Sequence, residues 1–306
     1  IVVDAIGSFD LSNKSLKRLR DNHVKILKHN DPWIFRWKLK EWLRRIWTRS
    51  HRKILIVDEE IAFVGGVNVE NAASSWDDLQ VRLTGKVVRQ LFYLFYKYYV
   101  HSGGRKDEVR KWLKPKREVL EKFKEKVKFI LHYPVLFGRQ SKFKSLYHRG
   151  LILAKESFTL VTPYYTPDLD FIRLIAEARK RGVKVNIISS QRPDVWIFKI
   201  LGRIFLEASI KAGATVYLSS KMNHAKVMGV DNKMGTVGSA NLTDRSMFWN
   251  RESGVVFEEE QMVKELNTIL DDWKQQAVIM KEIKNEQGGI IKSLLRRLAR
   301  LVRDYV

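Results

Sequence analysis

Two segments of this chain, far apart in sequence, carry the same pattern of chemically distinctive residues. The segments 51–58 (HRKILIVD) and 224–231 (HAKVMGVD) both read His-x-Lys-x-x-x-x-Asp. The agreement continues at matched offsets, with small residues 14 positions after each His, an Asn after 17 positions and an acid after 27 or 28. A repeat of this kind indicates two copies of one half-site and requires a fold that can hold both copies. The matched residues are Gly65-Gly66 and Gly238-Ser239, Asn68 and Asn241, and Asp78 and Glu252.

The second half of the chain predicts an alternation of strands and helices. Runs rich in β-branched residues are typical of buried strands, and apolar residues at helical spacing fill the stretches between them. Strands that alternate with helices indicate a mainly parallel sheet with helices on its faces, so the predicted fold class is α/β. The predicted order is strand 157–165, helix 169–182, strand 183–190 and helix 196–213, followed by a strand that leads into the second motif.

The first half repeats the end of that order, because a strand, a helix and a second strand precede the first motif within residues 1–30. By comparison with the second half, the N-terminal strand and helix of the first half are missing, so we expect further residues to precede Ile1. A highly charged stretch at 106–129 separates the halves, and helix is predicted from about residue 261 to the end. The predicted domains are 1–125 for the first half, 126–260 for the second half and 261–306 for a C-terminal helical extension.

Composition restricts both the partners and the chemistry of the chain. It has 57 Lys and Arg against 34 Asp and Glu, a net charge of +23, which favours a polyanionic partner, either anionic lipid or nucleic acid. It has no Cys, which excludes disulfides, thiolate nucleophiles and Cys-based zinc sites. No uncharged apolar run approaches the roughly 18–20 residues that a helix needs to span a bilayer.

Each motif predicts a β-hairpin that presents an imidazole and an ammonium to one pocket, because residues i and i+2 of a strand point the same way. The first motif places His51 beside Lys53. The second places His224 beside Lys226. Two such pairs can act on one phosphodiester, with one imidazole as a nucleophile that forms a phosphohistidine and the other as general acid and base. The two Lys and the two Asn would donate to the nonbridging oxygens. Because these donors are protein groups, we expect neither a metal nor a cofactor.

The repeated motifs resemble the paired HKD motifs of the phospholipase D superfamily, and the chain is more narrowly similar to bacterial cardiolipin synthases. The similarity extends over nearly the whole chain and departs from the family at Thr243, often Asp, and at Tyr165, usually Phe. It implies two pseudo-twofold-related halves whose motifs meet at one active site. The segments that carry it are RSHRKILIVDEEIAFVGGVNV at 49–69, WDD at 76–78, TPYYTPD at 162–168 and GSANLTDRSMFWNRE at 238–252.

The resemblance also implies roles for the acids and for each His. It implies cross-pairing between the halves, in which Glu252 orients His51 and Asp78 orients His224. It favours His51 as the nucleophile and His224 as the acid and base, an order that the residues themselves leave open. The acids within the motifs, Asp58 and Asp231, are implied to be structural.

Two basic amphipathic segments favour contact with a membrane surface. The stretch 33–47 interleaves Trp with Arg and Lys, which suits a membrane interface, although a segment packed over the active-site mouth is the alternative. The stretch 290–306 places apolar residues on one stripe of a helix with Arg beside it. Binding to anionic lipid and docking on the domain both fit this stretch. The residues predicted to contact lipid are Trp33, Trp37, Arg44, Arg45, Trp47, Arg296, Arg297 and Arg300.

The sequence therefore predicts a phosphatidyltransferase that joins two phosphatidylglycerols into cardiolipin and releases glycerol. A phospholipase D that lets water attack would use the same residues. A phospholipase D-like nuclease fits the charge, but Trp-rich and Leu-rich basic segments suit a bilayer better than a nucleic acid. We expect a membrane-associated enzyme, at the cytoplasmic face of a bacterial inner membrane, with anionic phospholipid as its partner. The candidates for an apolar wall that shields the intermediate from water are Tyr164, Tyr165, Trp196, Phe248 and Trp249.

Overall fold

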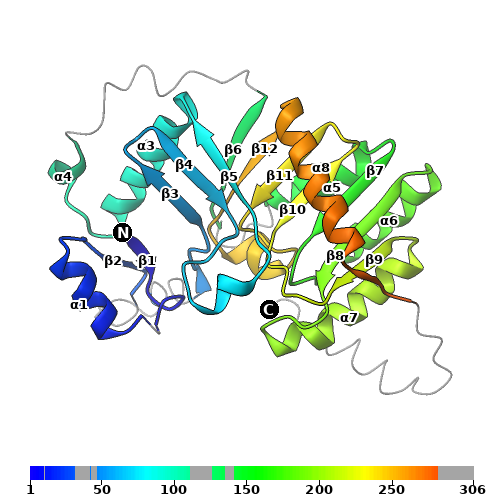
Figure 1. The fold of residues 1–306 in the computed structure, drawn as a ribbon, viewed down its shortest axis with the longest axis horizontal. Helices are drawn as coiled ribbons and strands as arrows, with labels where there is room; N and C mark the ends of the chain where they lie inside the picture. Colours follow the sequence, from blue (N-terminus) through cyan, green and yellow to red (C-terminus); the bar gives the residue numbers. More distant parts are fainter. Residues whose placement is uncertain (10, 32–41, 43–46, 111–125, 135–140, 282–306) are drawn as a thin grey trace.

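The computed structural model describes residues 1–306 apart from 10, 32–41, 43–46, 111–125, 135–140 and 282–306. Its largest element is an eight-stranded sheet with the order β13-β9-β8-β7-β10-β11-β12-β6 (Figure 1). Helices flank this sheet, so the α/β class is confirmed. The strands are β6 (Val127–His132), β7 (Ser157–Val161), β8 (Lys184–Ser190), β9 (Thr215–Ser219), β10 (Val227–Val230), β11 (Met234–Gly238), β12 (Glu252–Phe257) and β13 (Val278–Ile279).

The sheet is mixed, which corrects the expectation of a mainly parallel one. Strands β7, β8 and β9 run parallel, and all other neighbours pair antiparallel. A parallel connection needs a crossover of about a dozen residues or more, and helices supply it between β7, β8 and β9. Only residues 220–226 join β9 to β10, which is too short for a crossover, so β10 returns antiparallel to β7.

Alternate residues of the central strands build two cores, one on each face of the sheet. Leu160 and Ile187 pack with α5 (Lys142–Leu153), α6 (Leu169–Lys180) and α7 (Trp196–Lys211). Val161 and Ile188 point to the other face and pack with α8 (Glu260–Gln275). Full burial of each such side chain stabilises the fold by about 1.5–3 kcal/mol. The period of two along the strands thus decides which helix covers which face.

The helix predicted from residue 261 onward is interrupted after Gln275, and its predicted part at 282–306 lies outside the described residues. Helix α8 stops at Gln275, and the β-branched pair Val278–Ile279 forms β13 beside β9. Val263, Leu266 and Leu270 of α8 are buried in the core, so this helix is part of the packed domain. Among the helices within the described ranges, none combines the length and the apolar character that crossing a bilayer requires.

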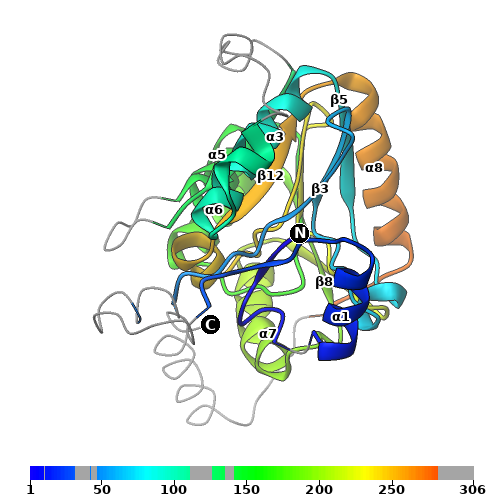
Figure 2. The same ribbon diagram turned by 90° about the vertical axis from the view of Figure 1, so that its left-hand side faces the viewer.

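The first half contributes two smaller sheets. β1 (Val2–Asp4) and β2 (Leu27–His29) form a parallel pair joined through α1 (Asn13–Asp21). An antiparallel three-stranded sheet follows and stands between α3 and α8 (Figure 2). The predicted boundary at residue 125 stays a prediction, because 111–125 lie outside the described residues. The remaining elements are β3 (Lys53–Val57), β4 (Ile61–Gly65), η2 (Ala72–Ser75), β5 (Gln80–Thr84), α3 (Lys86–His101), α4 (Lys106–Arg110) and, in the second half, η4 (Arg245–Trp249).

The two motif hairpins are built alike, as the repeat predicts. β3 pairs with β4 and β10 pairs with β11, both antiparallel, and each inner strand pairs onward with β5 or β12. Each hairpin turns through two residues with positive φ, at 52° and 59° for Asp58 and Glu59 and at 53° and 51° for Asp231 and Asn232. Two successive positive φ angles fit the twist of a tight hairpin, which Asp and Asn tolerate. Ala62 and Val64 of β4 then pack with Val237 of β11 in one core shared by both halves.

The motif acids differ in their surroundings although their turns match. Asp231 accepts backbone N–H bonds from Lys155, Glu156 and Ser157 at 2.8, 2.7 and 2.8 Å, and so ties the hairpin turn to the start of β7. Burial opposes ionisation, but these three donors outweigh it and hold the pKa of Asp231 below its usual value. Asp58 is exposed at the corresponding turn. The structural role that the resemblance implies for both acids is therefore supported by contacts at Asp231.

Replacement of Asp231 by Ala is expected to lower the free energy of unfolding by about 2 kcal/mol, because charge-assisted bonds to three backbone donors are lost. Asp58→Ala is the matched control, because it places Ala at the same positive φ without losing such bonds, and it is expected to destabilise the fold by at least about 1 kcal/mol less than Asp231→Ala. Urea denaturation at pH 7 measures both. The carboxylate's contribution is present above its unfolded pKa and is lost as the pH falls through its lowered folded pKa. Equal effects of the two variants would contradict this account of Asp231.

Candidate active site

Two isolated β-bridges cross between the halves beside the two His residues. Ser50 pairs with Arg251, and Asp77 pairs with Asn223. The backbone N–H of His51 donates to Arg251 O at 3.0 Å, and that of His224 donates to Asp77 O at 2.6 Å. Each His is therefore held by the segment of the opposite half that carries an acid. The two crossings occupy equivalent places in the repeat, which gives the site its pseudo-twofold symmetry.

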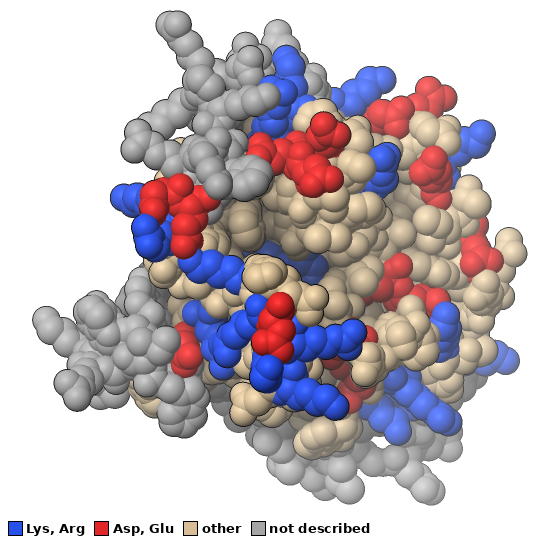
Figure 3. All heavy atoms as spheres, turned by 60° about the vertical axis from the view of Figure 1, so that its left-hand side comes forward, with Lys and Arg blue, Asp and Glu red and all other residues tan. Residues whose placement is uncertain are grey.

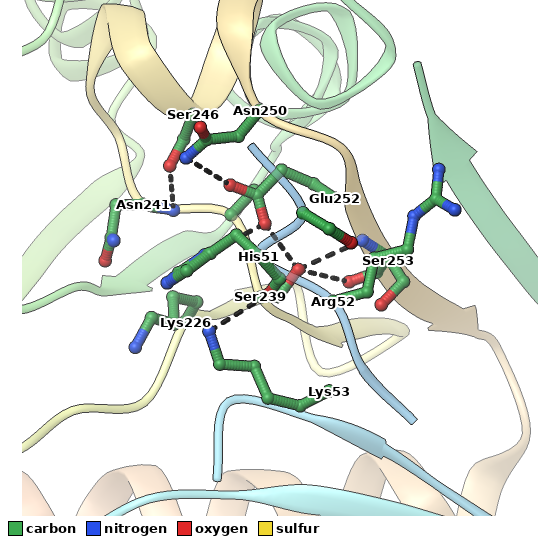
Figure 4. Close-up of polar contacts among 12 residues, drawn as sticks. His51, Arg52, Lys53, Lys226, Ser239, Asn241, Ser246, Asn250, Glu252 and Ser253 are labelled. Atoms are coloured by element: carbon green, nitrogen blue, oxygen red, sulfur yellow. Dashed lines mark hydrogen bonds and ion pairs between the residues drawn. The ribbon is translucent and has the colours of Figure 1, made fainter. Parts of the chain in front are cut away.

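The carboxylate of Glu252 fixes the ring of His51. His51 Nδ1 lies 3.1 Å from Glu252 Oε2, and Glu252 is fully buried. Ser239 Oγ donates to the same oxygen at 2.5 Å (Figure 4). Burial alone would raise the pKa of Glu252, but His51, Lys53 and Ser239 outweigh it and hold that pKa below its usual value. Because the ionised Glu252 carboxylate contacts Nδ1, the other ring nitrogen of His51, Nε2, takes no part in this contact.

His224 has the equivalent arrangement with the acid of the first half. Its Nδ1 lies 2.7 Å from Asp78 Oδ2. The His224 side chain is 4% exposed, against 28% for His51. Burial, together with Lys226, lowers the pKa of His224 to about 4 despite the opposing effect of Asp78. Burial and Lys53 also lower the pKa of His51, against the effect of Glu252. Both imidazoles are thus neutral near pH 7, as a nucleophile and a base require.

Each motif lysine donates to the carbonyl of its own His, and Lys226 Nζ also lies 2.8 Å from both ring nitrogens of His224. Lys53 Nζ donates to His51 O at 2.9 Å, and Lys226 Nζ donates to His224 O. Burial lowers the pKa of Lys53 to about 8 and that of Lys226 well below its usual value, while Asp78 and Glu252 oppose the shift. In Figure 4 the ends of Lys53 and Lys226 gather from opposite halves beside the ring of His51. The two half-sites therefore form one basic pocket.

The two predicted Asn residues are placed less alike. Asn241 is buried, and Thr162 Oγ1 lies 3.5 Å from its Oδ1. Figure 4 shows its amide on the same side as the ends of His51 and Lys226. Asn68 instead donates from Nδ2 to Glu70 at 2.8 Å. The structure thus brings Asn241 to the pocket, whereas the Asn68 side-chain amide is engaged by a neighbouring carboxylate.

Aromatic rings surround His224, although not all of those predicted for the wall. The His224 ring lies 5.1 Å from Trp76 and 6.3 Å from Tyr164, between centroids, and Tyr164 stacks on Phe198 at 4.2 Å. Tyr165 is fully buried in the core, so it does not line the pocket, and Trp196 is 69% exposed. Of the predicted wall, Tyr164 is next to His224, and Trp249 lies 6.1 Å from Trp47.

The residues predicted to contact lipid fall mostly outside the described part of the chain. Trp47 is described and is 37% exposed. Within the described residues, no group of three or more His, Cys, Asp or Glu is arranged to hold a metal ion. The predicted lipid contacts that lie outside the described residues are Trp33, Trp37, Arg44, Arg45, Arg296, Arg297 and Arg300.

Ser239 is a functional candidate that the sequence identified only as a small residue. Its counterpart in the first copy is Gly66, where an added Cβ would meet Asp78 Oδ1 at 2.2 Å. The two copies therefore pair a short acid with Gly and a longer, buried acid with a Ser hydroxyl that donates to it. The sequence contains this difference, because Gly66 and Asp78 of the first copy correspond to Ser239 and Glu252 of the second.

Comparison with known proteins agrees with this geometry. Residues 149–273 match a family model described as "Cardiolipin synthase, PLD-like domain". The second half of the chain is therefore similar to phospholipase D-like domains. The predicted resemblance to the phospholipase D superfamily, and to bacterial cardiolipin synthases within it, is confirmed.

The similarity to curated cardiolipin synthases extends over nearly the whole chain. The sequence is 27% identical over 285 residues to the cardiolipin synthase of Geobacillus thermodenitrificans, which covers 90% of this chain and 55% of that protein. It is 26% identical over 321 residues to that of Geobacillus sp. strain WCH70, which covers 98% of this chain and 60% of that protein. The chain thus spans little more than half the length of these relatives.

A solved structure supports the fold. The crystal structure of phosphatidylserine synthase from Haemophilus influenzae superposes with a TM-score of 0.69 at 13% identity. The superposition covers 100% of this chain and 82% of that one.

The charge of Lys53 is expected to set the alkaline limit of activity on a soluble chromogenic phosphodiester. Because the pKa of Lys53 is about 8, kcat/KM should fall as the pH rises through that value and the ammonium is lost. Lys53→Arg keeps the charge and is expected to move the limit upward, even if the rate falls. A limit that stays near pH 8 in Lys53→Arg would contradict this assignment.

Proposed function

We propose that this chain carries the active site of a phosphatidyltransferase of the cardiolipin synthase type, which transfers a phosphatidyl group from one phosphatidylglycerol to another. The observation that carries the proposal is the crossed pairing of the halves. His51 Nδ1 lies 3.1 Å from Glu252, and His224 Nδ1 lies 2.7 Å from Asp78. Two oriented imidazoles within one basic pocket suit double displacement at phosphorus.

In the first step, Nε2 of His51 attacks the phosphorus of the donor lipid. The P–N bond forms, and the bond from phosphorus to the oxygen of the headgroup glycerol breaks. Protonated His224 gives its proton to that oxygen, so that glycerol leaves. His51 is the proposed nucleophile because its side chain is 28% exposed, whereas that of His224 is 4% exposed. A bound phosphodiester anion raises the pKa of His224 from its resting value, which favours the protonated acid that this step needs.

In the second step, the hydroxyl of a second phosphatidylglycerol attacks the phosphatidyl-histidine. Neutral His224 takes the hydroxyl proton, the new P–O bond forms, and the P–N bond to His51 breaks. The products are cardiolipin and free enzyme. Lys53 and Lys226 stabilise the charge on the nonbridging oxygens in both steps. The rings of Trp76 and Tyr164 beside His224 limit the access of water, which favours transfer over hydrolysis.

Lipid mass spectrometry after incubation with phosphatidylglycerol vesicles tests the proposal. We expect cardiolipin and glycerol in equal amounts. His51→Ala and His224→Ala should each lower the rate by about 10³-fold or more, because a nucleophile or a general acid is lost. His23→Asn is the matched control, because His23 is exposed and its φ of 60° suits Asn.

The alternative outcomes are equally specific. Phosphatidic acid in place of cardiolipin would identify a hydrolase that uses the same residues and would contradict transfer. Full activity in either motif variant would contradict the proposed chemistry. We also propose, from the kind of substrate, that the enzyme works at a membrane surface on the cytoplasmic side of a bacterial inner membrane.

A further inference from the structure

Three of the exposed apolar side chains lie far apart in sequence, two of them on loops and one at the first residue of α7. Val69 is 105% exposed, Phe9 is 86% exposed and Trp196 is 69% exposed. Single exposed apolar residues are ordinary on a soluble protein, but several gathered on one face mark an interaction surface. The strand pairings and one hydrogen bond place the segments that carry these three residues at the same end of the molecule.

Val69 and Trp196 follow strands that end where the motifs begin. Gly65, at the end of β4, pairs with Lys53, so the loop that carries Val69 leaves the sheet beside the first motif. In the second half, Val161 at the end of β7 pairs with both Val227 and Ile188. β8 therefore ends at the edge where β10 begins, and Trp196 follows β8 there. Both residues lie at the edge of the sheets from which His51 and His224 enter the pocket.

Phe9 reaches the same edge through β1. This strand ends at Asp4, whose Oδ2 accepts the N–H of Ser50 at 2.8 Å, one residue before His51. The loop that carries Phe9 leaves from this point. Figures 1 and 2 both place α1, η2 and α7 around the same end of the molecule. We call Phe9, Val69 and Trp196, together with α1, the mouth face.

The mouth face is also strongly basic. Helix α1 follows the Phe9 loop, is anchored by buried Leu16, and exposes four cationic side chains. Its one acid, Asp21, lies 2.7 Å from Lys17. In Figure 3, lysine and arginine side chains gather over α1 next to a hollow in the surface, and basic atoms are visible within that hollow. The four exposed cations are Lys14, Lys17, Arg18 and Arg20.

We propose that the mouth face docks on the surface of an anionic lipid bilayer, with Phe9, Val69 and Trp196 inserted among the headgroups and α1 lying over lipid phosphates. Apolar tips that project from a cationic face suit an interface with an apolar interior and anionic headgroups, whereas a nucleic acid offers no such interior. Docking in this orientation turns the hollow toward the lipids. The proposal rests on the proposed function for its ligand, because a membrane phosphodiester must reach His51.

Sedimentation of the full chain with vesicles tests the proposal, using the His51→Ala background so that no turnover occurs. Val69→Ser combined with Trp196→Ser should lower partitioning onto phosphatidylglycerol vesicles by about tenfold or more, because apolar area no longer enters the interface. Lys14→Glu with Arg18→Glu should lower binding to phosphatidylglycerol vesicles but not to phosphatidylcholine vesicles. Leu153→Ser is the matched control, because Leu153 is 62% exposed and precedes β7 at the opposite edge.

Several results would overturn the proposal. Among them are a wild-type chain that does not sediment with phosphatidylglycerol vesicles, unchanged binding in both face variants, and an equal loss in Leu153→Ser. Loss of retention on double-stranded DNA in the face variants, without any loss on vesicles, would assign the face to nucleic acid instead. Failure of the proposed function gives a different result, since binding would still depend on the mouth face while wild-type protein made no cardiolipin.

Discussion

The carboxylate–imidazole bonds that cross between the halves are the interaction on which the rest of the site depends. Glu252 belongs to the second half and holds His51 of the first, while Asp78 of the first half holds His224 of the second. The bridges between Ser50 and Arg251 and between Asp77 and Asn223 fix the backbones of the same segments. Neither half therefore contains a complete site. The shared core between β4 and β11 sets the distance between the half-sites, so packing there controls the geometry of the pocket.

The charge of the pocket follows from the same arrangement. Two ammonium groups and two carboxylates share a buried space, and Lys226 is only 1% exposed. Burial lowers the pKa of both Lys residues and of both His residues, so the free pocket holds its positive charge less strongly than exposed groups would. An entering phosphodiester anion reverses this tendency, because it stabilises the charged forms of the same groups. Lys53, with a pKa of about 8, is already charged at pH 7, and the substrate adds to the positive charge of the pocket.

The repeat predicted the two hairpins and their turns, because those features depend on local patterns at matched offsets. The crossed pairs were implied by the resemblance to the phospholipase D superfamily and not by the repeat itself. The mixed sheet was not predicted, because the prediction rested on the alternation of strands and helices. It did not take into account that the connection 220–226 is too short for a parallel crossover. The acids Asp58 and Asp231 have the same place in the pattern, yet only Asp231 meets the start of β7 through three backbone donors. Trp196 was predicted to line the apolar wall of the pocket, but at the start of α7 its side chain is exposed. Such differences arise from tertiary contacts, which cannot be inferred from the sequence motifs alone.

The most direct test of the central claim is intact-protein mass spectrometry of a trapped intermediate. The donor would be a phosphatidyl ester of p-nitrophenol, whose leaving group needs no proton, and the enzyme would be the His224→Ala variant. The first step can then proceed, but the second lacks its base. We predict a phosphatidyl adduct that accumulates on His51 and is absent from the variant that also carries His51→Ala. An adduct on another residue, or its persistence without His51, would contradict the account.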